Sequence, residues 1–93
     1  MEIAKMCTLS TEHISMETDQ WLTEQSKEPT EGLCVYEKAG GHFIHVPDFL
    51  SFEIMELPED LEEIIAYILS DDIDWICLDS DGPVETMFPT YNW

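Results

Sequence analysis

The chain has 93 residues, of which 44% are hydrophobic, and it carries 21 Asp and Glu against three Lys and no Arg, for a formal net charge of −18. This length predicts a single domain over residues 1–93. The charge excludes nucleic acids and anionic membranes as direct partners and favours basic proteins. Aromatic and branched aliphatic residues are frequent, which argues against intrinsic disorder.

The N-terminal part of the chain predicts a strand followed by a helix. Apolar residues recur from Ile3 to Leu9 and indicate the strand. A helix is expected from about Met16 to Ser26, because the Ser15 hydroxyl can cap it and the acidic residues that follow suit the positive end of a helix dipole. The apolar stripe of this helix is thin, so we expect it to lie over a sheet.

A β-hairpin is predicted next. The runs Leu33–Tyr36 and His42–Val46 flank a turn in which Gly40 and Gly41 can supply positive φ angles. Pro47 ends the second strand. An apolar segment follows and is expected to pack on the core or to present a contact surface; it contains Phe49, Leu50, Phe52, Ile54 and Met55.

The strongest helical pattern begins at Pro58, which suits the first helical position because its missing N–H is not needed there. Apolar residues at helical spacing define one buried face. They are Leu61, Ile64, Ile65, Ile68 and Leu69. Acidic residues are expected on the opposite face, namely Glu59, Asp60, Glu62 and Glu63. The polar residues 70–72 end the helix.

The last strong pattern is the apolar run within Asp74–Asp79, which predicts a central strand covered on both faces. Residues 80–83 form a turn, and the tail from Val84 to Trp93 is expected to return to the body. The order β-α-β-β-α-β matches the ferredoxin-like arrangement. We therefore expect an α+β fold with a four-stranded antiparallel sheet and two helices on one face.

Residues 53–81 contain eleven carboxylates and no Lys or Arg. Carboxylates three or four residues apart on a helix lie about 5–6 Å from each other, whereas one DNA strand carries a charge every ~3.4 Å along its axis. Such a helix face is sparser than a duplex, yet it can occupy the same Lys and Arg side chains. The alternative is a solvated surface without a specific partner. The predicted partner-binding residues are Glu59, Asp60, Glu62, Glu63, Asp71, Asp72 and Asp74.

No motif for catalysis or cofactor binding is present. The sequence contains no GxSxG, P-loop, GxGxxG or HExxH pattern, so we predict a non-enzymatic protein without catalytic residues, cofactor or metal site. His42 and His45 are three apart on a strand and point to opposite faces; with His13, they are expected at the surface or at sheet edges. Asp79–Gly82 resembles the start of a Ca²⁺ loop, but the glycine comes early and a proline follows, which favours a plain turn.

The three cysteines are Cys7, Cys34 and Cys77, and they form no Cys-x-x-Cys pair. An odd, dispersed set predicts buried free thiols and a reducing cytoplasm. The first residues lack a basic segment followed by a long apolar one, so we expect neither a signal peptide nor a membrane-spanning helix.

Two stretches resemble a known family. They are Ser10–Ser15 with Glu17, Thr18, Trp21 and Leu22, and Asp74–Val84 followed by Pro89–Trp93. Together they resemble a family of small acidic domains of unknown function carried by plasmids and phages. The resemblance implies no active site. It implies a setting, because small acidic proteins of mobile elements often block host defence, as anti-restriction and anti-CRISPR proteins do.

The leading hypothesis is an anti-CRISPR-like inhibitor that acts as an acidic DNA mimic in the cytoplasm of a bacterial host cell. Its expected partner is a basic nucleic-acid-binding protein, foremost a CRISPR effector. The alternative is a small interaction module or regulator that binds through an apolar patch, with Phe49, Phe52 or Trp93 as anchors and with acidity serving solubility. Both hypotheses are compatible with a monomer and with a homodimer.

Overall fold

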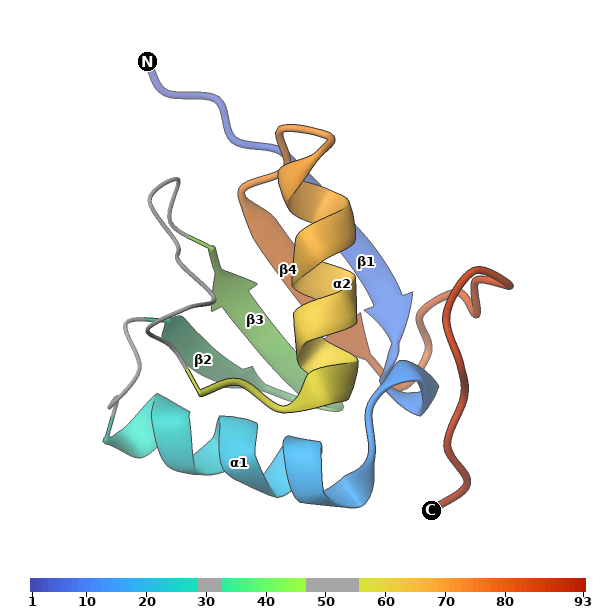
Figure 1. Ribbon diagram of the computed structural model, residues 1–93. Helices are drawn as coiled ribbons and strands as arrows, with labels where there is room; N and C mark the ends of the chain where they lie inside the picture. The colour runs from blue at the N-terminus through green and yellow to red at the C-terminus, as the bar shows by residue number, and fades with distance from the viewer. Residues whose placement is uncertain (29–32, 47–55) are drawn as a thin grey trace.

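The computed structural model describes residues 1–28, 33–46 and 56–93. Its elements are β1 (Met6–Ser10), the short 3₁₀ helix η1 (Thr11–His13), α1 (Met16–Lys27), β2 (Cys34–Lys38), β3 (Gly41–His45), α2 (Glu59–Leu69) and β4 (Trp75–Asp79) (Figure 1). The predicted α+β class and the predicted order of strands and helices are confirmed. The apolar segment with Phe49, Phe52 and Met55 lies outside the described residues.

The four strands form one mixed sheet in the order β1-β4-β3-β2. β1 runs parallel to β4, while the β4–β3 and β3–β2 pairs are antiparallel. The predicted antiparallel, ferredoxin-like sheet is therefore wrong. The segment that contains α2 returns the chain beside β3, and β1 pairs with the remaining edge of β4. β4 consequently lies in the middle of the sheet, as its apolar run predicted.

The first strand begins three residues later than expected. Ile3 is 87% exposed, and the pairing with β4 starts only where Met6 faces Trp75. The strand then continues through Ser10, whose backbone N–H donates to the Pro83 carbonyl at 2.8 Å. This bond ties the C-terminal tail to the end of β1.

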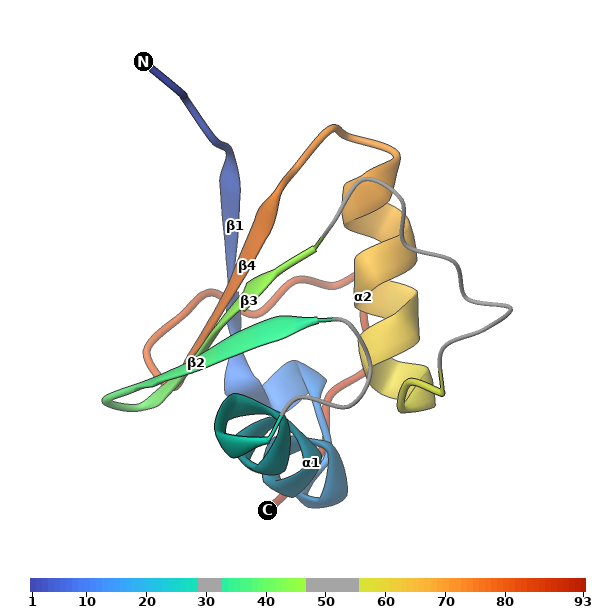
Figure 2. The same ribbon diagram turned by 90° about the vertical axis from the view of Figure 1, so that its left-hand side faces the viewer.

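Both helices lie on one side of the sheet, and the other side is open (Figure 2). On β3, His42 and Ile44 are buried on the helix side, whereas Phe43 and His45 are only partly buried on the open side, as the alternation of strand side chains requires. Within the described residues no helix covers the open side of β4, yet Cys77 on that side is only 6% exposed. The centre of β4 is therefore buried on both sides, with Ile76 and Leu78 on the helix side. The core between sheet and helices consists of Leu9, Ile14, Leu22, Leu33, Val35, Ile44, Val46, Leu61, Ile64, Ile65, Ile68, Ile76 and Leu78.

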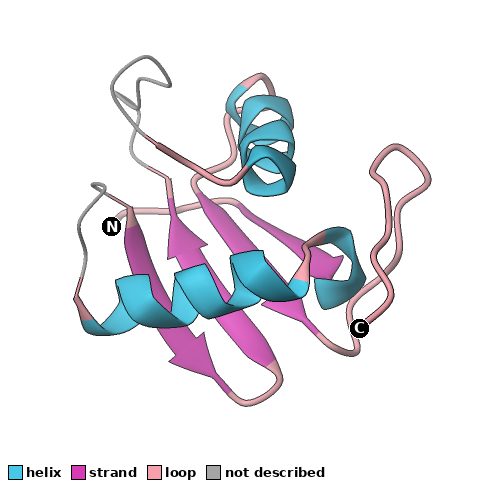
Figure 3. Cartoon of the chain, turned by 60° about the horizontal axis from the view of Figure 1, so that its bottom comes forward, coloured by secondary structure: helices cyan, strands magenta, loops and turns pink. Residues whose placement is uncertain are grey.

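The two helices begin as their sequences suggest. The Ser15 hydroxyl accepts from the Thr18 N–H at 3.2 Å, so the predicted N-cap of α1 is confirmed. Pro58, predicted as the first helical residue, instead stands at the N-cap of α2, one position before the helix begins at Glu59, and makes no side-chain cap bond. The predicted apolar face of α2 is buried except for Leu69, which is partly buried. Figure 3 shows α1 crossing the strands, with the tail beside η1.

The two glycines of the hairpin have different roles. Gly40 has φ +79° and supplies the turn conformation that the sequence predicts. Gly41 already belongs to β3, and a Cβ there would collide with the Leu78 carbonyl on β4. It is therefore a position of close backbone approach and does not supply a second positive φ. Among the described helices, none has the length and apolar character needed to cross a membrane.

Candidate functional site

Asp60 does not belong to the exposed acidic face. It is 8% exposed and accepts the Ser15 N–H at 2.7 Å and the Thr18 hydroxyl at 2.6 Å. Asp60 precedes Ile64 by four residues and therefore lies on the buried face of α2. The carboxylate links the start of α2 to the start of α1, so its predicted place on the exposed acidic face of α2 is wrong.

The other predicted residues form two groups at opposite ends of α2. Glu59 and Glu63 are exposed near its start, and Asp71 and Asp72 are exposed just after its end. A rise of about 1.5 Å per residue separates Glu59 from Leu69 by about 15 Å along the helix axis, and Asp71 and Asp72 follow that end. Two predicted residues are partly buried, namely Glu62 and Asp74. The exposed members of the predicted set are thus divided between the two ends of α2.

Asp74 has a structural contact of its own. Its Oδ2 accepts the Lys5 N–H at 3.1 Å, and its backbone N–H donates to the Lys5 carbonyl at 3.0 Å. These bonds hold the N-terminal segment against the start of β4. Asp74 therefore offers fewer free acceptor positions to a partner than Asp71 or Asp72.

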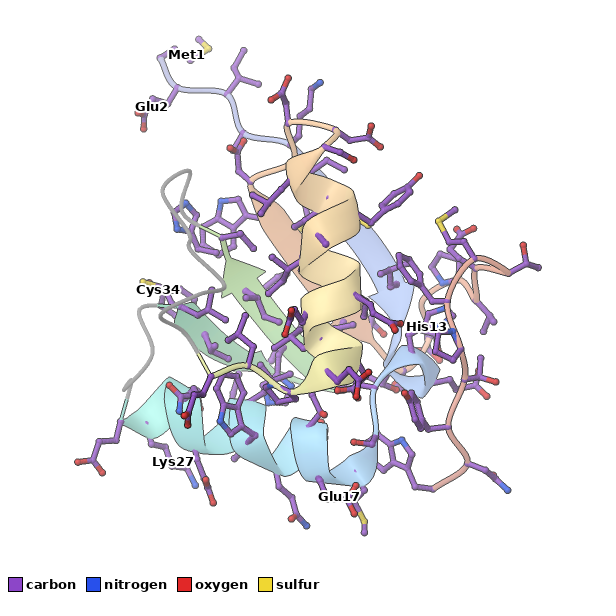
Figure 4. All side chains as sticks on the ribbon, viewed as in Figure 1. Met1, Glu2, His13, Glu17, Lys27 and Cys34 are labelled. Atoms are coloured by element: carbon purple, nitrogen blue, oxygen red, sulfur yellow. The ribbon has the colours of Figure 1, made fainter. Side chains whose placement is uncertain are left out.

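Exposed carboxylates also follow α1, where sequence analysis had placed no partner-binding residue. They are Glu17, Glu24 and Glu28. Figure 4 shows Glu17 projecting away from the sheet. Both helices lie on the same side of the sheet, and exposed acids lie on or directly after both of them. We call this set of exposed acids the acidic helical layer and define it by Glu17, Glu24, Glu28, Glu59, Glu63, Asp71 and Asp72.

The open side of the sheet carries a second feature that sequence analysis missed. Met6, Tyr36, Phe43 and Trp75 line a shallow apolar depression of about 380 Å³. The Tyr36 and Trp75 rings lie 6.0 Å apart, and the His45 ring lies 4.9 Å from Trp75. The signal was the alternation of side chains along the four strands, which identifies one shared face once the strand register is known. We call this set the open-face patch.

His13 is buried, so its predicted surface position is wrong. It is 1% exposed. Its Nε2 accepts the Glu85 N–H at 2.9 Å, which leaves Nδ1 to donate to the Pro89 carbonyl at 2.9 Å. The Phe88 ring contacts it edge-on, with centroids 5.6 Å apart. The imidazole therefore holds the tail against η1 and is fully used for structure (Figure 4).

The rest of the tail also returns to the body, as predicted. The Tyr91 N–H donates to the Glu12 carbonyl at 2.7 Å, and the Trp93 indole N–H donates to the Ile14 carbonyl at 2.8 Å. Burial first, and then the nearby carboxylates of α2, raise the pKa of Tyr91. The tail thus lies close to the acidic start of α2.

His42 is likewise buried, at 4% exposure, contrary to the surface position that was predicted. Its Nε2 lies 3.2 Å from the Thr23 hydroxyl, and its Nδ1 lies 3.7 Å from the nearest Asp19 oxygen. Burial lowers the pKa of His42 below its usual 6.5, although the charges of Asp19 and Glu37 oppose this shift. The prediction that His42 and His45 point to opposite faces is confirmed.

The lowered pKa of His42 predicts a loss of stability on acidification. The folded state binds fewer protons than the unfolded state, so the contribution is present above pH 6.5 and is lost as the pH falls through the lower, folded-state pKa. We expect the free energy of unfolding to decline as the pH falls below 6.5. Urea denaturation at several pH values checks this. His42→Asn should flatten the decline, and His45→Asn should retain the His42 contribution; equal slopes in both variants would contradict it.

The Asp79–Gly82 segment is a turn, as predicted. One Asp79 oxygen accepts the Asp81 N–H at 2.8 Å and the other pairs with Lys38 at 2.6 Å. Hydrogen bonding to Lys38 lowers the pKa of Asp79 and raises that of Lys38. Within the described residues, no group of three His, Cys, Asp or Glu is placed to hold a metal ion.

The cysteines are free, but they are not all buried. Cys77 is buried, Cys7 is partly buried and Cys34 is exposed. Burial, with a smaller effect of the Glu85 charge, raises the pKa of Cys7. The prediction of buried thiols is therefore wrong for Cys34, which lies on the edge strand β2.

Comparison with known proteins gives one match. A family model described as "Family of unknown function (DUF5983) C-terminal domain" covers residues 6–93. No curated protein and no solved structure matches the chain.

Proposed function

The chain belongs to this family of unknown function, and from that premise we propose that it is a non-enzymatic inhibitor whose acidic helical layer occupies a basic, nucleic-acid-binding groove. The proposed target is a host defence complex, foremost a CRISPR effector, in the cytoplasm of a bacterial cell. The proposed setting of plasmids and phages rests on the resemblance of the chain to small acidic domains of mobile elements. The observation that carries the proposal is the placement of exposed acids on two packed helices.

The acids are held by a rigid support. The buried face of α2 packs Leu61, Ile64 and Ile68 into the core, each 1% exposed or less, so the neighbouring carboxylates cannot collapse onto the surface as they could in a disordered tail. Only three Lys oppose 21 acids in the sequence. Such a surface attracts a basic groove at long range and releases the counterions of that groove on binding.

The open-face patch supports a second candidate function. Met6 and Tyr36 are 49% and 54% exposed, and large exposed aromatic residues are frequent anchors in protein interfaces. In this alternative, the chain is a small interaction module that binds through the open side of the sheet, and its charge serves solubility. Raised salt would then leave the affinity almost unchanged.

Charge reversal distinguishes the two functions. We expect Glu59→Lys combined with Glu63→Lys to weaken competition against labelled duplex DNA for a purified CRISPR effector by about 100-fold, because each lost contact with a basic side chain corresponds to roughly tenfold. Fluorescence anisotropy measures the displacement.

The matched control combines Glu2→Lys with Asp81→Lys, which changes the net charge equally at two exposed positions outside both helices. It should retain competition. If the two double variants behave alike, the helical placement of the acids is irrelevant and the proposal is wrong. If only Tyr36→Ser weakens binding, the open-face patch is the functional surface.

A further inference from the structure

A cavity of about 470 Å³ lies between α1 and the β2–β3 turn, away from the open-face patch. Its lining includes Asp19, Thr23, Glu37, Lys38, His42 and Trp93. Neither the acidic helical layer nor the tail contacts of His13 account for it. Two carboxylates, a buried imidazole and an indole therefore share one concave site.

The hydrogen bonds around His42 fix its protonation. The Thr23 hydroxyl donates its proton to the Asp19 carbonyl at 3.1 Å, so it accepts from the His42 Nε2–H at 3.2 Å. The Nδ1 atom of His42 is then an unprotonated acceptor. It is buried and has no hydrogen-bond partner among the described residues, an arrangement that is uncommon because a buried polar atom without a partner costs free energy.

A second acceptor faces this nitrogen. The Asp19 carboxylate lies 3.7 Å away, beyond hydrogen-bond range, and keeps 30% of its side chain exposed, so it can move aside. Two electron-rich groups that face each other favour a ligand that supplies N–H donors to both. The Glu37 charge also acts on His42, whereas the Lys38 charge is compensated by Asp79 at 2.6 Å. The cavity is therefore anionic.

We propose that this cavity binds a guanidinium group, which donates one N–H to the Asp19 carboxylate and another to His42 Nδ1. A guanidinium presents several donors in a planar fork and also stacks on aromatic rings, and Trp93 lines the same cavity. The group is either the side chain of an arginine on a basic partner or a free guanidinium compound. The first source rests on the proposed function, because that function requires a basic partner.

The test is an NMR titration of the full chain with N-acetyl-arginine amide at constant ionic strength. We expect saturable shifts in the amides of Asp19, Thr23 and His42 and in the His42 Nδ1 resonance. The neutral citrulline analogue, which has nearly the same shape, should give none. Asp19→Asn should weaken binding about tenfold, since it removes a charge-assisted hydrogen bond.

Glu2→Gln is the control, because it removes one exposed charge outside both the cavity and the acidic helical layer. It should bind N-acetyl-arginine amide like the parent chain. Equal shifts with the citrulline analogue, or equal affinity of Asp19→Asn and Glu2→Gln, would overturn the proposal. Glu37→Gln provides a second variant should Asp19→Asn fold poorly, and it should also weaken binding.

The source of the group is distinguished with the effector. If Asp19→Asn weakens competition against labelled DNA, the ligand is a side chain of the partner; if it binds N-acetyl-arginine amide weakly but competes normally, the ligand is a free compound. If the titration fails but the parent chain still competes with DNA, only the proposed guanidinium site is overturned. If the titration succeeds but Glu59→Lys and Glu63→Lys do not change the competition, the guanidinium site is supported and the proposed function is overturned.

Discussion

Asp60→Ala is expected to lower the free energy of unfolding by about 3 kcal/mol, because it removes charge-assisted hydrogen bonds at the start of both helices. The carboxylate accepts the Ser15 N–H at 2.7 Å and the Thr18 hydroxyl at 2.6 and 2.9 Å. Its Oδ1 also lies 3.0 Å from the Leu61 N–H. Without the carboxylate, these buried donors lose their partner. Urea denaturation followed by circular dichroism measures the change.

The neighbouring Glu59→Ala is the control for this prediction. Glu59 is exposed in the first turn of the same helix, and its removal should change the free energy of unfolding by less than about 0.5–1 kcal/mol. Equal effects of the two substitutions would show that Asp60 acts only through its charge near the helix dipole. The claim that Asp60 stabilises the protein by connecting α1 to α2 would then be wrong.

His13→Ala is expected to release the C-terminal tail and to cost about 2–3 kcal/mol of stability. The substitution leaves the Glu85 N–H and the Pro89 carbonyl without their imidazole partner and removes the contact with Phe88. Hydrogen exchange should quicken at the Glu85 and Tyr91 amides while the amides of β4 stay protected.

His45→Ala serves as its control, since it removes an imidazole from the open side of the sheet, far along the chain from the tail contacts. It should leave exchange in the tail unchanged. Should the Glu85 and Tyr91 amides exchange at the parent rate in His13→Ala, the bonds of His13 do not hold the tail.

Local patterns in the sequence predicted the helices and the hairpin well. The Ser15 hydroxyl caps α1, the apolar spacing that includes Ile64 and Ile68 defines the buried face of α2, and Gly40 adopts the expected positive φ. These features depend on neighbours within a few residues. Short segments of the sequence therefore determine these features.

The features that were missed depend on contacts between distant segments. The parallel pairing of Met6 with Trp75 joins residues near opposite ends of the chain, and no local pattern specifies it. His13 is buried by a tail more than 70 positions away. Asp60 is an exception among these features, because its spacing of four residues from Ile64 is a local pattern that already predicts the buried face of α2. The expectation of an exposed position followed from its charge alone.

The candidate site was predicted only in part, because some of its residues come together through contacts between distant segments. The exposed acids of α2 follow from the helical spacing of Glu59 and Glu63, but the contribution of α1 becomes visible only when both helices lie on one side of the sheet (Figure 2). Predicting the open-face patch requires the strand register, because only the register assigns Tyr36, Phe43 and Trp75 to one surface.

The most direct measurement is the salt dependence of effector binding by the parent chain and by the Glu59→Lys, Glu63→Lys variant. If fixed anions on the helices replace nucleic-acid phosphates in a basic groove, the logarithm of the affinity falls steeply with the logarithm of the salt concentration. The variant should show a shallower slope as well as weaker binding. A parent affinity that stays constant as salt rises, or an unchanged slope in the variant, would contradict the account.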